Sequence, residues 1–380
     1  NIRGSDVPFS PVTNCNCLVG KNKKILLIGK INKFKNLLKK RIILKNQIID
    51  PKNFTNLIES LKGKNFIIDE KTCSIFNERL IDKKFQIKAR IDPCYLLKAK
   101  KNSAEIHNMI KSHIDDGLAL TKFIFWIKNY KNFGLTELDA EKKLEYLRKK
   151  SKNYLYPSFN TIAGSGPNGA VIHYRASDKT NRKIKRKDIF LCDSGGQYRY
   201  GTTDVTRTIC FSEPSKKIKK VFTLVLKGHI AVATSDLNKD KKGYQLDIKA
   251  RKFLKEKGYD FKHGTGHGVG FFSNVHEGPQ SISKYNKVKL EDGMILSNEP
   301  GYYEEGKFGI RIENLIFIKK IKKKLFFENL TLAPLDKELI DEKMLTKKEK
   351  DYIFKYHLMI YSKLSNFLNY KEKKWLIEQL

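Results

Sequence analysis

The features that most constrain this chain are carboxylates standing inside apolar, strand-like sequence. Asp193 follows the apolar run at residues 189–192 (IFLC). Asp204 lies in residues 201–211 (GTTDVTRTICF), which we expect to pair with that run as a β-hairpin. Burying an ionised carboxylate costs free energy unless a cation or hydrogen-bond donors compensate it. A fold that encloses these strands must therefore bring positive charge to both aspartates.

Two further acidic residues occur in similar contexts downstream. Glu299 lies in residues 296–301 (LSNEPG), and Glu313 alternates with Arg311 in residues 309–315 (GIRIENL). Because side chains alternate along a β-strand, we expect one strand to direct Arg311 and Glu313 to the same face.

A glycine- and histidine-rich stretch lies between these acids, at residues 261–279 (FKHGTGHGVGFFSNVHEGP). It holds His263, His267 and His276, three of the eight histidines in the chain. Imidazole is a common ligand of divalent metals and carries protons near neutral pH, while glycine lets the backbone approach a ligand closely. By itself such a stretch could be a turn with incidental histidines. The matching carboxylates favour a metal site.

Four carboxylates and one imidazole suit a pair of divalent metal ions, because four negative charges balance two dications. Oxygen-rich ligation favours Mn²⁺, with Zn²⁺, Co²⁺ and Fe²⁺ as alternatives. Two such ions about 3.5–4 Å apart can acidify a water molecule and polarise a carbonyl group. The residues therefore predict a dinuclear hydrolase. The expected ligands are Asp193, Asp204, His267, Glu299 and Glu313.

The first hundred residues predict a small α/β domain. Residues 1–12 read as a linker or the remnant of another unit, followed by a domain at residues 13–98. Apolar runs predict strands at residues 24–28, 41–44 and 66–69. Amphipathic stretches at residues 32–40 and 54–61 suit short helices.

Longer helices are expected from residue 103 onward, in a catalytic domain at residues 99–328 and a helical extension at 329–380. Ser103 is expected to cap a helix that ends near Lys128. Thr136 and Asp139 form a capping pair, and Asp247 is expected to cap a helix that ends before Gly258. Further helices are expected at residues 215–235 and 346–380.

Composition narrows the classes of partner. The net charge of +35 raises the question of nucleic acid, but the lysines are spread along the whole chain. The densest basic clusters, residues 182–187 and 216–220, have little aromatic sequence for base stacking. We therefore expect a solvated basic surface and no nucleic-acid partner. The apolar runs are too short to span a membrane, and six cysteines without a CxxC pair suggest reduced thiols and a cytoplasmic protein.

Three motifs resemble those of the pita-bread metallopeptidases, specifically the Xaa-Pro aminopeptidase (aminopeptidase P) family of peptidase family M24. They are DSGGQYRYGTTDVTRT, HGTGHGVGFFSNVHEGP and LSNEPGYYEEGKFGIRIENL. The resemblance implies an α+β pita-bread catalytic domain preceded by a small α/β domain like the creatinase N-terminal domain. Residues 1–12 resemble the end of the first domain of the long form, so we expect most of that domain to lie outside this sequence.

The resemblance also implies roles for individual residues. Asp193 would bind one metal ion, His267 and Glu299 the other, and Asp204 and Glu313 both. A hydroxide bridging the two ions would attack the scissile carbonyl, with Glu299 managing its proton. The remaining implied site residues are His276 beside the oxyanion, His173 near the scissile nitrogen and proline ring, His263 in the pocket wall and Arg311 supporting the bridging carboxylates.

The implied substrates are peptides with proline in second position. The nitrogen of an Xaa-Pro bond carries no hydrogen, so a site must hold it through the ring and the carbonyl. Two alternatives remain open: a prolidase, which cleaves Xaa-Pro dipeptides, and a non-catalytic peptide-binding member of the fold. A homodimer is also expected from the resemblance.

Overall fold

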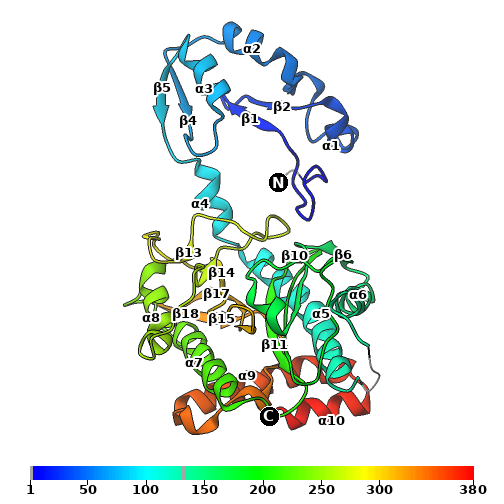
Figure 1. Cartoon of the computed structure of the whole chain (residues 1–380). Coiled ribbons are helices and arrows are strands. Elements are labelled where there is room, and N and C mark those ends of the chain that lie inside the picture. The colour runs from blue at the N-terminus through cyan, green and yellow to red at the C-terminus, as the bar shows by residue number, and fades with distance from the viewer. Residues whose placement is uncertain (1–2, 131–133) are drawn as a thin grey trace. The chain divides into compact units, whose positions relative to one another are not determined.

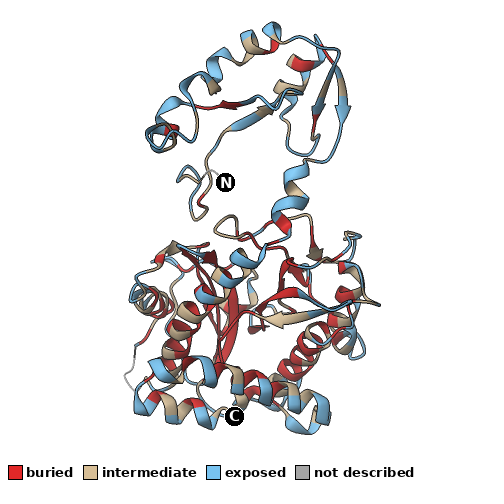
Figure 2. Ribbon diagram, turned by 180° about the vertical axis from the view of Figure 1, so that it is seen from behind, coloured by how far each residue is buried: buried red, intermediate tan, exposed pale blue. Residues whose placement is uncertain are grey.

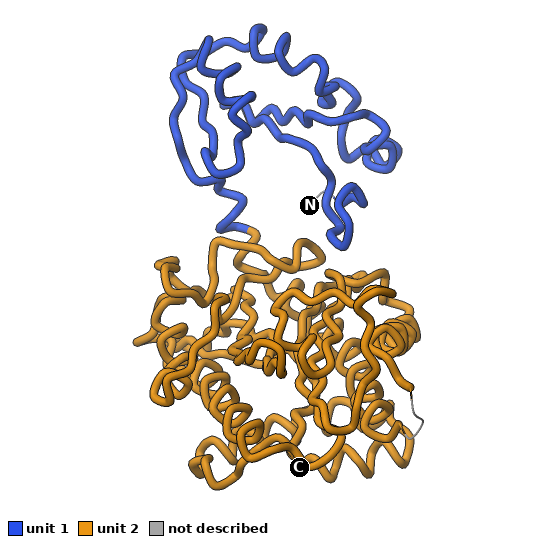
Figure 3. The backbone as a smooth tube through the Cα atoms, viewed as in Figure 1, with its two compact units in different colours: residues 1–97 blue, residues 98–380 orange. Residues whose placement is uncertain are grey.

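The computed structural model describes residues 3–130 and 134–380, and the chain forms two compact units (Figure 3). Unit 1 comprises residues 1–97 and unit 2 residues 98–380. The domain boundaries expected at residues 12 and 328 fall within these units and stay predictions.

Unit 1 contains two small sheets with short helices (Figure 1). In the first sheet β2 pairs antiparallel with β1 and parallel with β3, whereas β4 and β5 form a parallel pair. A core of Ile58, Ile68, Ile81 and Phe85 packs beneath the second sheet. The strands are β1 (Asn16–Val19), β2 (Ile25–Ile28), β3 (Ile48–Ile49), β4 (Asn65–Ile68) and β5 (Gln86–Ala89). The helices are η1 (Ile31–Phe34), α1 (Lys35–Lys39), η2 (Lys45–Gln47), η3 (Pro51–Asn53), α2 (Phe54–Ser60), α3 (Ile75–Asp82) and α4 (Pro93–Ala99), which ends in unit 2.

The strand expected at residues 41–44 is wrong. The backbone amides of Arg41 and Ile42 bond back to the carbonyls of Leu38 and Leu37, which closes the end of α1. Arg41 takes a left-handed φ of 52°, and Ile42 and Leu44 are exposed. The apolar run therefore follows a helix end, and the pairing strand is β3 further along the chain.

The helices of unit 2 begin at residues that satisfy their first amides. Asn102, not the expected Ser103, caps α5, because its side chain accepts from the amide of Glu105, whose carboxylate accepts from the amide of Asn102. The expected capping pair of Thr136 and Asp139 is confirmed at α6. The helices are α5 (Ser103–Lys128), α6 (Glu137–Arg148), η4 (Gly166–Ala170), α7 (Lys216–Ala233), α8 (Gly243–Lys255), η5 (Lys337–Leu339), η6 (Glu342–Met344), α9 (Lys347–Leu364), η7 (Ser365–Phe367) and α10 (Tyr370–Glu378).

The expected N-cap at Asp247 is wrong, because α8 begins at Gly243 and Asp247 lies within it. A Cβ atom at Gly243 would stand 1.8 Å from the carbonyl oxygen of Ser281, so only glycine fits this helix start. The Asp247 carboxylate instead accepts hydrogen bonds from Thr265 Oγ1 at 2.7 Å and Arg251 Nε at 2.9 Å. Through Thr265, it thus anchors the first part of the glycine- and histidine-rich stretch.

The strands of unit 2 form several small antiparallel sheets flanked by helices (Figure 1). The sheet orders are β10-β9-β6, β11-β8-β7, β12-β13, β14-β17-β18 and β15-β16. The strands are β6 (Tyr154–Pro157), β7 (Ile162–Ser165), β8 (Ile189–Ser194), β9 (Gly196–Tyr198), β10 (Gly201–Thr202), β11 (Val205–Cys210), β12 (Gly266–His267), β13 (Ser281–Ile282), β14 (Ile295–Asn298), β15 (Gly301–Glu304), β16 (Phe308–Arg311), β17 (Asn314–Ile321) and β18 (Lys324–Asn329).

Buried residues concentrate in the central strands and the inner faces of the long helices of unit 2 (Figure 2). All residues of β8 and β11 are buried, including the acidic and hydroxyl side chains. No helix among the described residues is both long and apolar enough to cross a bilayer.

Candidate metal centre

The paired strands β8 and β11 bring the first two carboxylates together. Asp193 on β8 lies opposite Thr206 on β11, and Asp204 directly precedes β11. The strand expected over residues 201–211 is broken between β10 and β11, which pair with β9 and β8 respectively. Asp204 stands at this break, where the chain passes from one sheet to the other.

The pair β14 and β17 brings the other two carboxylates together. Their register aligns Asn298 with Asn314, so Glu299 just after β14 and Glu313 just before β17 emerge at the same sheet end. The amide of Glu313 donates to the carbonyl oxygen of Thr206, and Thr206 Oγ1 donates to Glu313 Oε2 at 2.8 Å. These bonds join the two sheets at the site.

Arg311 and Glu313 do not share one strand, contrary to the expectation. Arg311 is the last residue of β16, which pairs with β15, whereas Glu313 lies between β16 and β17. The chain leaves the β15-β16 pair after Arg311 and joins β14 at Asn314, so it changes sheets across Ile312 and Glu313. Both flanking side chains are nevertheless buried at the site.

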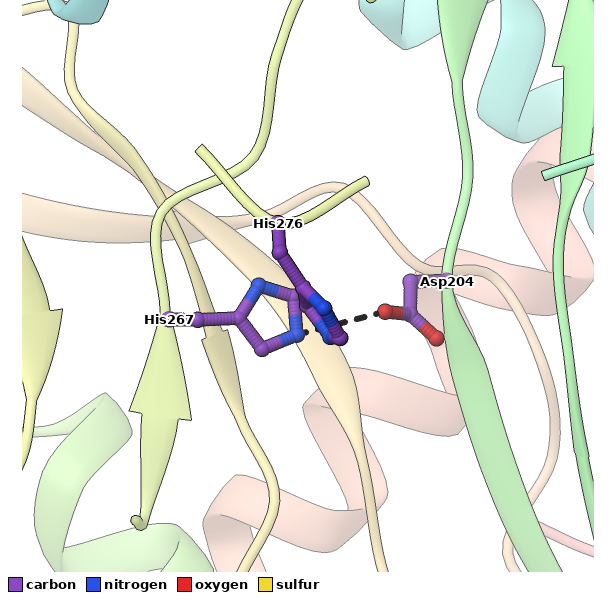
Figure 4. Close-up of side chains that lie close together, drawn as sticks. All are labelled: Asp204, His267 and His276. Atoms are coloured by element: carbon purple, nitrogen blue, oxygen red, sulfur yellow. Dashed lines mark ion pairs between the residues drawn. The ribbon is translucent and has the colours of Figure 1, made fainter. Parts of the chain in front are cut away.

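His267 approaches Asp204 from β12 (Figure 4). Its Nδ1 lies 2.9 Å from the carbonyl oxygen of Gly268, which assigns the proton to Nδ1 and leaves the Nε2 lone pair free. Nε2 is 3.4 Å from both Asp204 Oδ2 and Glu299 Oε1. The Ser297 hydroxyl accepts from the amide of His267 and donates to Glu299 Oε1 at 2.9 Å, so it orients both.

The expected ligands form overlapping groups whose ligand atoms lie within 4.8 Å of one another. One group is Asp193, Asp204 and Glu313, and a second is His267, Glu299 and Glu313. Asp193 Oδ1 and Glu313 Oε1 are buried without a hydrogen-bond partner among the described residues. Buried carboxylate oxygens are normally paired, so these free oxygens, together with the crowding of four acids, fit a pair of divalent cations.

Without a cation, the protein opposes ionisation of these acids. Burial, followed by the charges of Asp193 and Glu299, raises the pKa of Asp204 well above its usual value. Burial and the neighbouring Asp204 likewise raise the pKa of Glu313, and burial raises the pKa of Glu299. A divalent cation would allow all of them to ionise together.

We expect Mn²⁺ to raise the melting temperature of metal-stripped protein, and to raise it more at pH 8 than at pH 5.5. The raised pKa values mean that the folded metal-free protein holds protons that the unfolded chain releases above the ordinary carboxyl range. Its stability therefore falls as pH rises through that window, and bound cations remove this loss. At a hundredfold excess over Kd each occupied site adds about 2.7 kcal/mol. Thermal unfolding with and without Mn²⁺ at both pH values tests this expectation. An equal rise in melting temperature at pH 5.5 and pH 8 would contradict it.

A cavity of about 550 Å³ opens onto the acids, and every site residue expected from the sequence lines it. Solvent exclusion and then Arg311 lower the pKa of His263 to about 4, and His263 Nε2 lies 2.9 Å from the Tyr303 hydroxyl. Solvent exclusion and then His267 lower the pKa of His276 to about 4, with the two rings 4.1 Å apart. Both histidines are therefore neutral near pH 7. His173 lines the same cavity.

Arg311 is buried beside the acids and donates to one of them and to two hydroxyl groups. Its Nη2 donates to Asp193 Oδ2 at 2.5 Å, its Nε to Thr206 Oγ1 at 3.1 Å, and its Nη1 to the Tyr303 hydroxyl at 2.6 Å. One oxygen of Asp193 is thereby fixed, and the other is left facing the site. Arg311 therefore compensates part of the buried negative charge and fixes the orientation of the Asp193 carboxylate.

The sequence interpretation missed three residues that organise this centre: Thr206, Ser297 and Tyr303. The alternation of side chains could have found Thr206, which lies two residues after Asp204 near the start of β11. Ser297 and Tyr303 act through contacts between segments that are distant in sequence, and no local pattern signals them.

A separate cluster away from this centre also has metal-ligand spacing, and its members are Cys210, Asp336 and Glu338. Here Lys128 Nζ already lies 2.7 Å from Asp336 Oδ1 and 3.4 Å from Glu338 Oε2. Because a protein cation occupies this group, it is an ion-pair cluster that ties α5 to the C-terminal segment.

Small antiparallel sheets surrounding a buried carboxylate and histidine cluster define the pita-bread class of metal-dependent hydrolases. The chain belongs to metallopeptidase family M24, whose model matches residues 98–320. The model of the C-terminal region of this family matches residues 323–380, and a creatinase/prolidase N-terminal domain matches residues 1–105. The family and the α+β pita-bread fold expected from the sequence are thus confirmed.

Similar proteins include curated relatives and solved structures. A protein of Paracoccidioides brasiliensis (strain Pb03) named "Probable Xaa-Pro aminopeptidase P" is 39% identical over 99% of this chain and 66% of its own length. X-prolyl aminopeptidase from Caenorhabditis elegans, described as a cytosolic enzyme with a di-nuclear active site, has a TM-score of 0.86 at 30% identity. It covers 99% of this chain, which spans 64% of that structure. Prolidase from Pyrococcus furiosus has a TM-score of 0.68 at 27% identity, with coverages of 87% and 92%. The chain thus spans just under two thirds of the relative and of the nematode enzyme.

Proposed function

We propose that this protein is a metal-dependent Xaa-Pro aminopeptidase, which releases the first residue of peptides whose second residue is proline. One observation carries the proposal. Buried carboxylates, two of whose oxygens have no hydrogen-bond partner among the residues that the structure describes, lie beside His267 at the wall of a cavity that three further histidines also line. The similarity to enzymes named for this activity supports it.

In the proposed site, Asp193 would bind one metal ion, His267 and Glu299 would bind the other, and Asp204 and Glu313 would be shared between them. Two such ions supply an acidified water and a polarised carbonyl group, and the oxygen-rich ligands favour Mn²⁺. Arg311 holds Asp193 in place. Glu299 is the proposed proton carrier, because the Ser297 hydroxyl fixes one of its oxygens, which lies 3.4 Å from His267 Nε2.

The three cavity histidines are assigned to the substrate. His276 is neutral at pH 7 and lies beside His267, which supports a role in which it would donate to the oxygen of the scissile carbonyl as negative charge develops there. His173 and His263 would border the proline ring. Tyr303 holds His263 through its hydroxyl group, which keeps that wall of the cavity rigid.

The test is a panel of three peptides offered to metal-stripped protein after Mn²⁺ is restored: Xaa-Pro-Xaa, Xaa-Pro and Xaa-Ala-Xaa. We expect release of the first residue from the Pro tripeptide and little cleavage of the Ala tripeptide. Cleavage of the dipeptide alone would make the protein a prolidase. This is the second candidate function, and the similarity to the Pyrococcus prolidase favours it. No cleavage of any peptide would contradict an enzymatic function.

Two further proposals accompany this function. A cytoplasmic location is proposed because the nematode relative is described as cytosolic. The homodimer expected from the resemblance remains a prediction, and sedimentation of the purified protein would test it.

A further inference from the structure

A closed loop connects the two histidines beside the candidate metal centre. We define the histidine loop as residues 268–277, which follow His267 and include His276. The amide of Glu277 donates to the carbonyl oxygen of Gly268 at 2.8 Å, which closes the neck of the loop. Within it, the amide of Gly270 donates to the carbonyl oxygen of Asn274 at 3.0 Å. The neck therefore fixes the spacing of the two imidazole rings.

Glu277 at this neck forms a buried ion pair with Lys101. Lys101 Nζ lies 3.0 Å from Glu277 Oε1, and the two side chains are 0% and 2% exposed. Lys98 Nζ lies 3.4 Å from the other oxygen but is 43% exposed. A displaced loop would leave a buried charge unpaired at high cost, so the pair favours one loop position.

Lys101 connects this pair to the strand that leads to Glu299. Its amide donates to the carbonyl oxygen of Gly293 at 2.9 Å, just before β14 begins. Gly293 has a φ of 81°, and a Cβ atom there would stand 2.4 Å from the carbonyl oxygen of Lys101. The backbone of Lys101 is thus held against the segment just before β14, while its side chain holds the loop.

The loop packs tightly around the Glu277 side chain. A Cβ atom at Gly268 would stand 2.0 Å from the carbonyl oxygen of Glu277, and one at Gly270 would stand 2.9 Å from Glu277 Oε2. The carboxylate therefore sits against the backbone of its own loop. Movement of Glu277 would carry the adjoining His276 with it.

We propose that Lys101 and Glu277 are positioning residues, which set the place of His276 relative to His267 without touching the substrate. Neither lies among the residues that line the cavity. The expected change in kcat rests on the proposed function. The expected effect of Lys101 and Glu277 on the position of the histidine loop does not depend on catalysis.

The first test compares Lys101→Met with the control Lys100→Met. Met has nearly the length of Lys without its charge, and Lys100 pairs with Glu291 on the surface, where the side chains are 42% and 40% exposed. We expect Lys101→Met to lower kcat for the Pro tripeptide about 10–100-fold, the range seen for residues that orient active-site groups, with KM and bound metal little changed. The control should match the wild type. A kcat within twofold of the control would overturn the proposal.

A double-mutant cycle separates positioning from general destabilisation. If Lys101 acts through His276, adding Lys101→Met to His276→Ala should lower kcat no further. A full multiplicative loss in the double variant would overturn the proposal. Should Lys101→Met fail to fold, Glu277→Gln replaces it in the same cycle.

Amide hydrogen exchange provides a readout that needs no activity. We expect the histidine loop to exchange faster in Lys101→Met than in Lys100→Met, with α7 unchanged. Equal exchange in the two variants would overturn the positioning role. Faster exchange with an inactive wild type would instead refute the proposed function and leave the positioning of the loop supported.

Discussion

Replacing Asp204 with asparagine is expected to lower hydrolysis of an Xaa-Pro-Xaa tripeptide by about 10³-fold or more, because it removes a carboxylate that we propose is shared by two metal ions. Asp204 is 4% exposed. Its carboxylate lies close to Asp193 and Glu313 in one set of possible metal ligands and close to His267 in another. Asparagine keeps the shape but presents one neutral oxygen. Steady-state assays at saturating Mn²⁺ provide the measurement.

The control for this variant is Asp178→Asn, which removes an exposed carboxylate outside the site. Its rate should equal that of the wild type. Circular dichroism should show both variants folded, and bound metal should fall only in Asp204→Asn. A rate within tenfold of the wild type for Asp204→Asn would remove Asp204 from the proposed centre.

The largest effect on stability is expected from Asp116→Ala. Asp116 accepts from Arg148 Nε and from the Tyr198 hydroxyl, each at 2.8 Å. Arg148 is 1% exposed and also donates to Ser194 Oγ at 3.1 Å, next to Asp193. Loss of Asp116 leaves a buried guanidinium without a counter-charge, which typically costs about 3–5 kcal/mol. Urea unfolding measures this change.

The control substitution changes the net charge of the protein by the same amount, but it removes a carboxylate from an ion pair on the surface. Glu328→Ala breaks a 2.8 Å contact with Lys319, whose side chain is 46% exposed. Exposed pairs contribute about 1 kcal/mol or less, so this variant should unfold close to the wild-type midpoint. Equal losses in Asp116→Ala and Glu328→Ala would show that the buried network does not stabilise the fold as argued.

Local patterns predicted the elements whose signals lie within a few residues. The Thr136–Asp139 capping pair and the buried strand before Asp193 have the expected form, because capping and apolar runs are short-range features. The prediction that Asp247 caps a helix was wrong, because an aspartate can either cap a helix or accept buried hydrogen bonds from other segments. Only the packing of Gly243 against Ser281 decides between them.

The candidate ligands were inferred from acids in apolar context, and the structure brings these side chains around one cavity. Their supports could not be inferred. Ser297 acts on His267 across the pairing of distant segments, and Lys101 reaches Glu277 from far earlier in the chain. Such contacts depend on sheet register and on burial, which a single sequence does not display.

The most direct test of a two-metal peptidase is the titration of metal-stripped protein with Mn²⁺, following both bound metal and tripeptide hydrolysis. If the four carboxylates and His267 are the ligands, as proposed, activity should rise with added metal and reach its maximum at two bound ions per chain. Full activity in protein shown to be free of metal, or a maximum at less than one bound ion, would contradict the account.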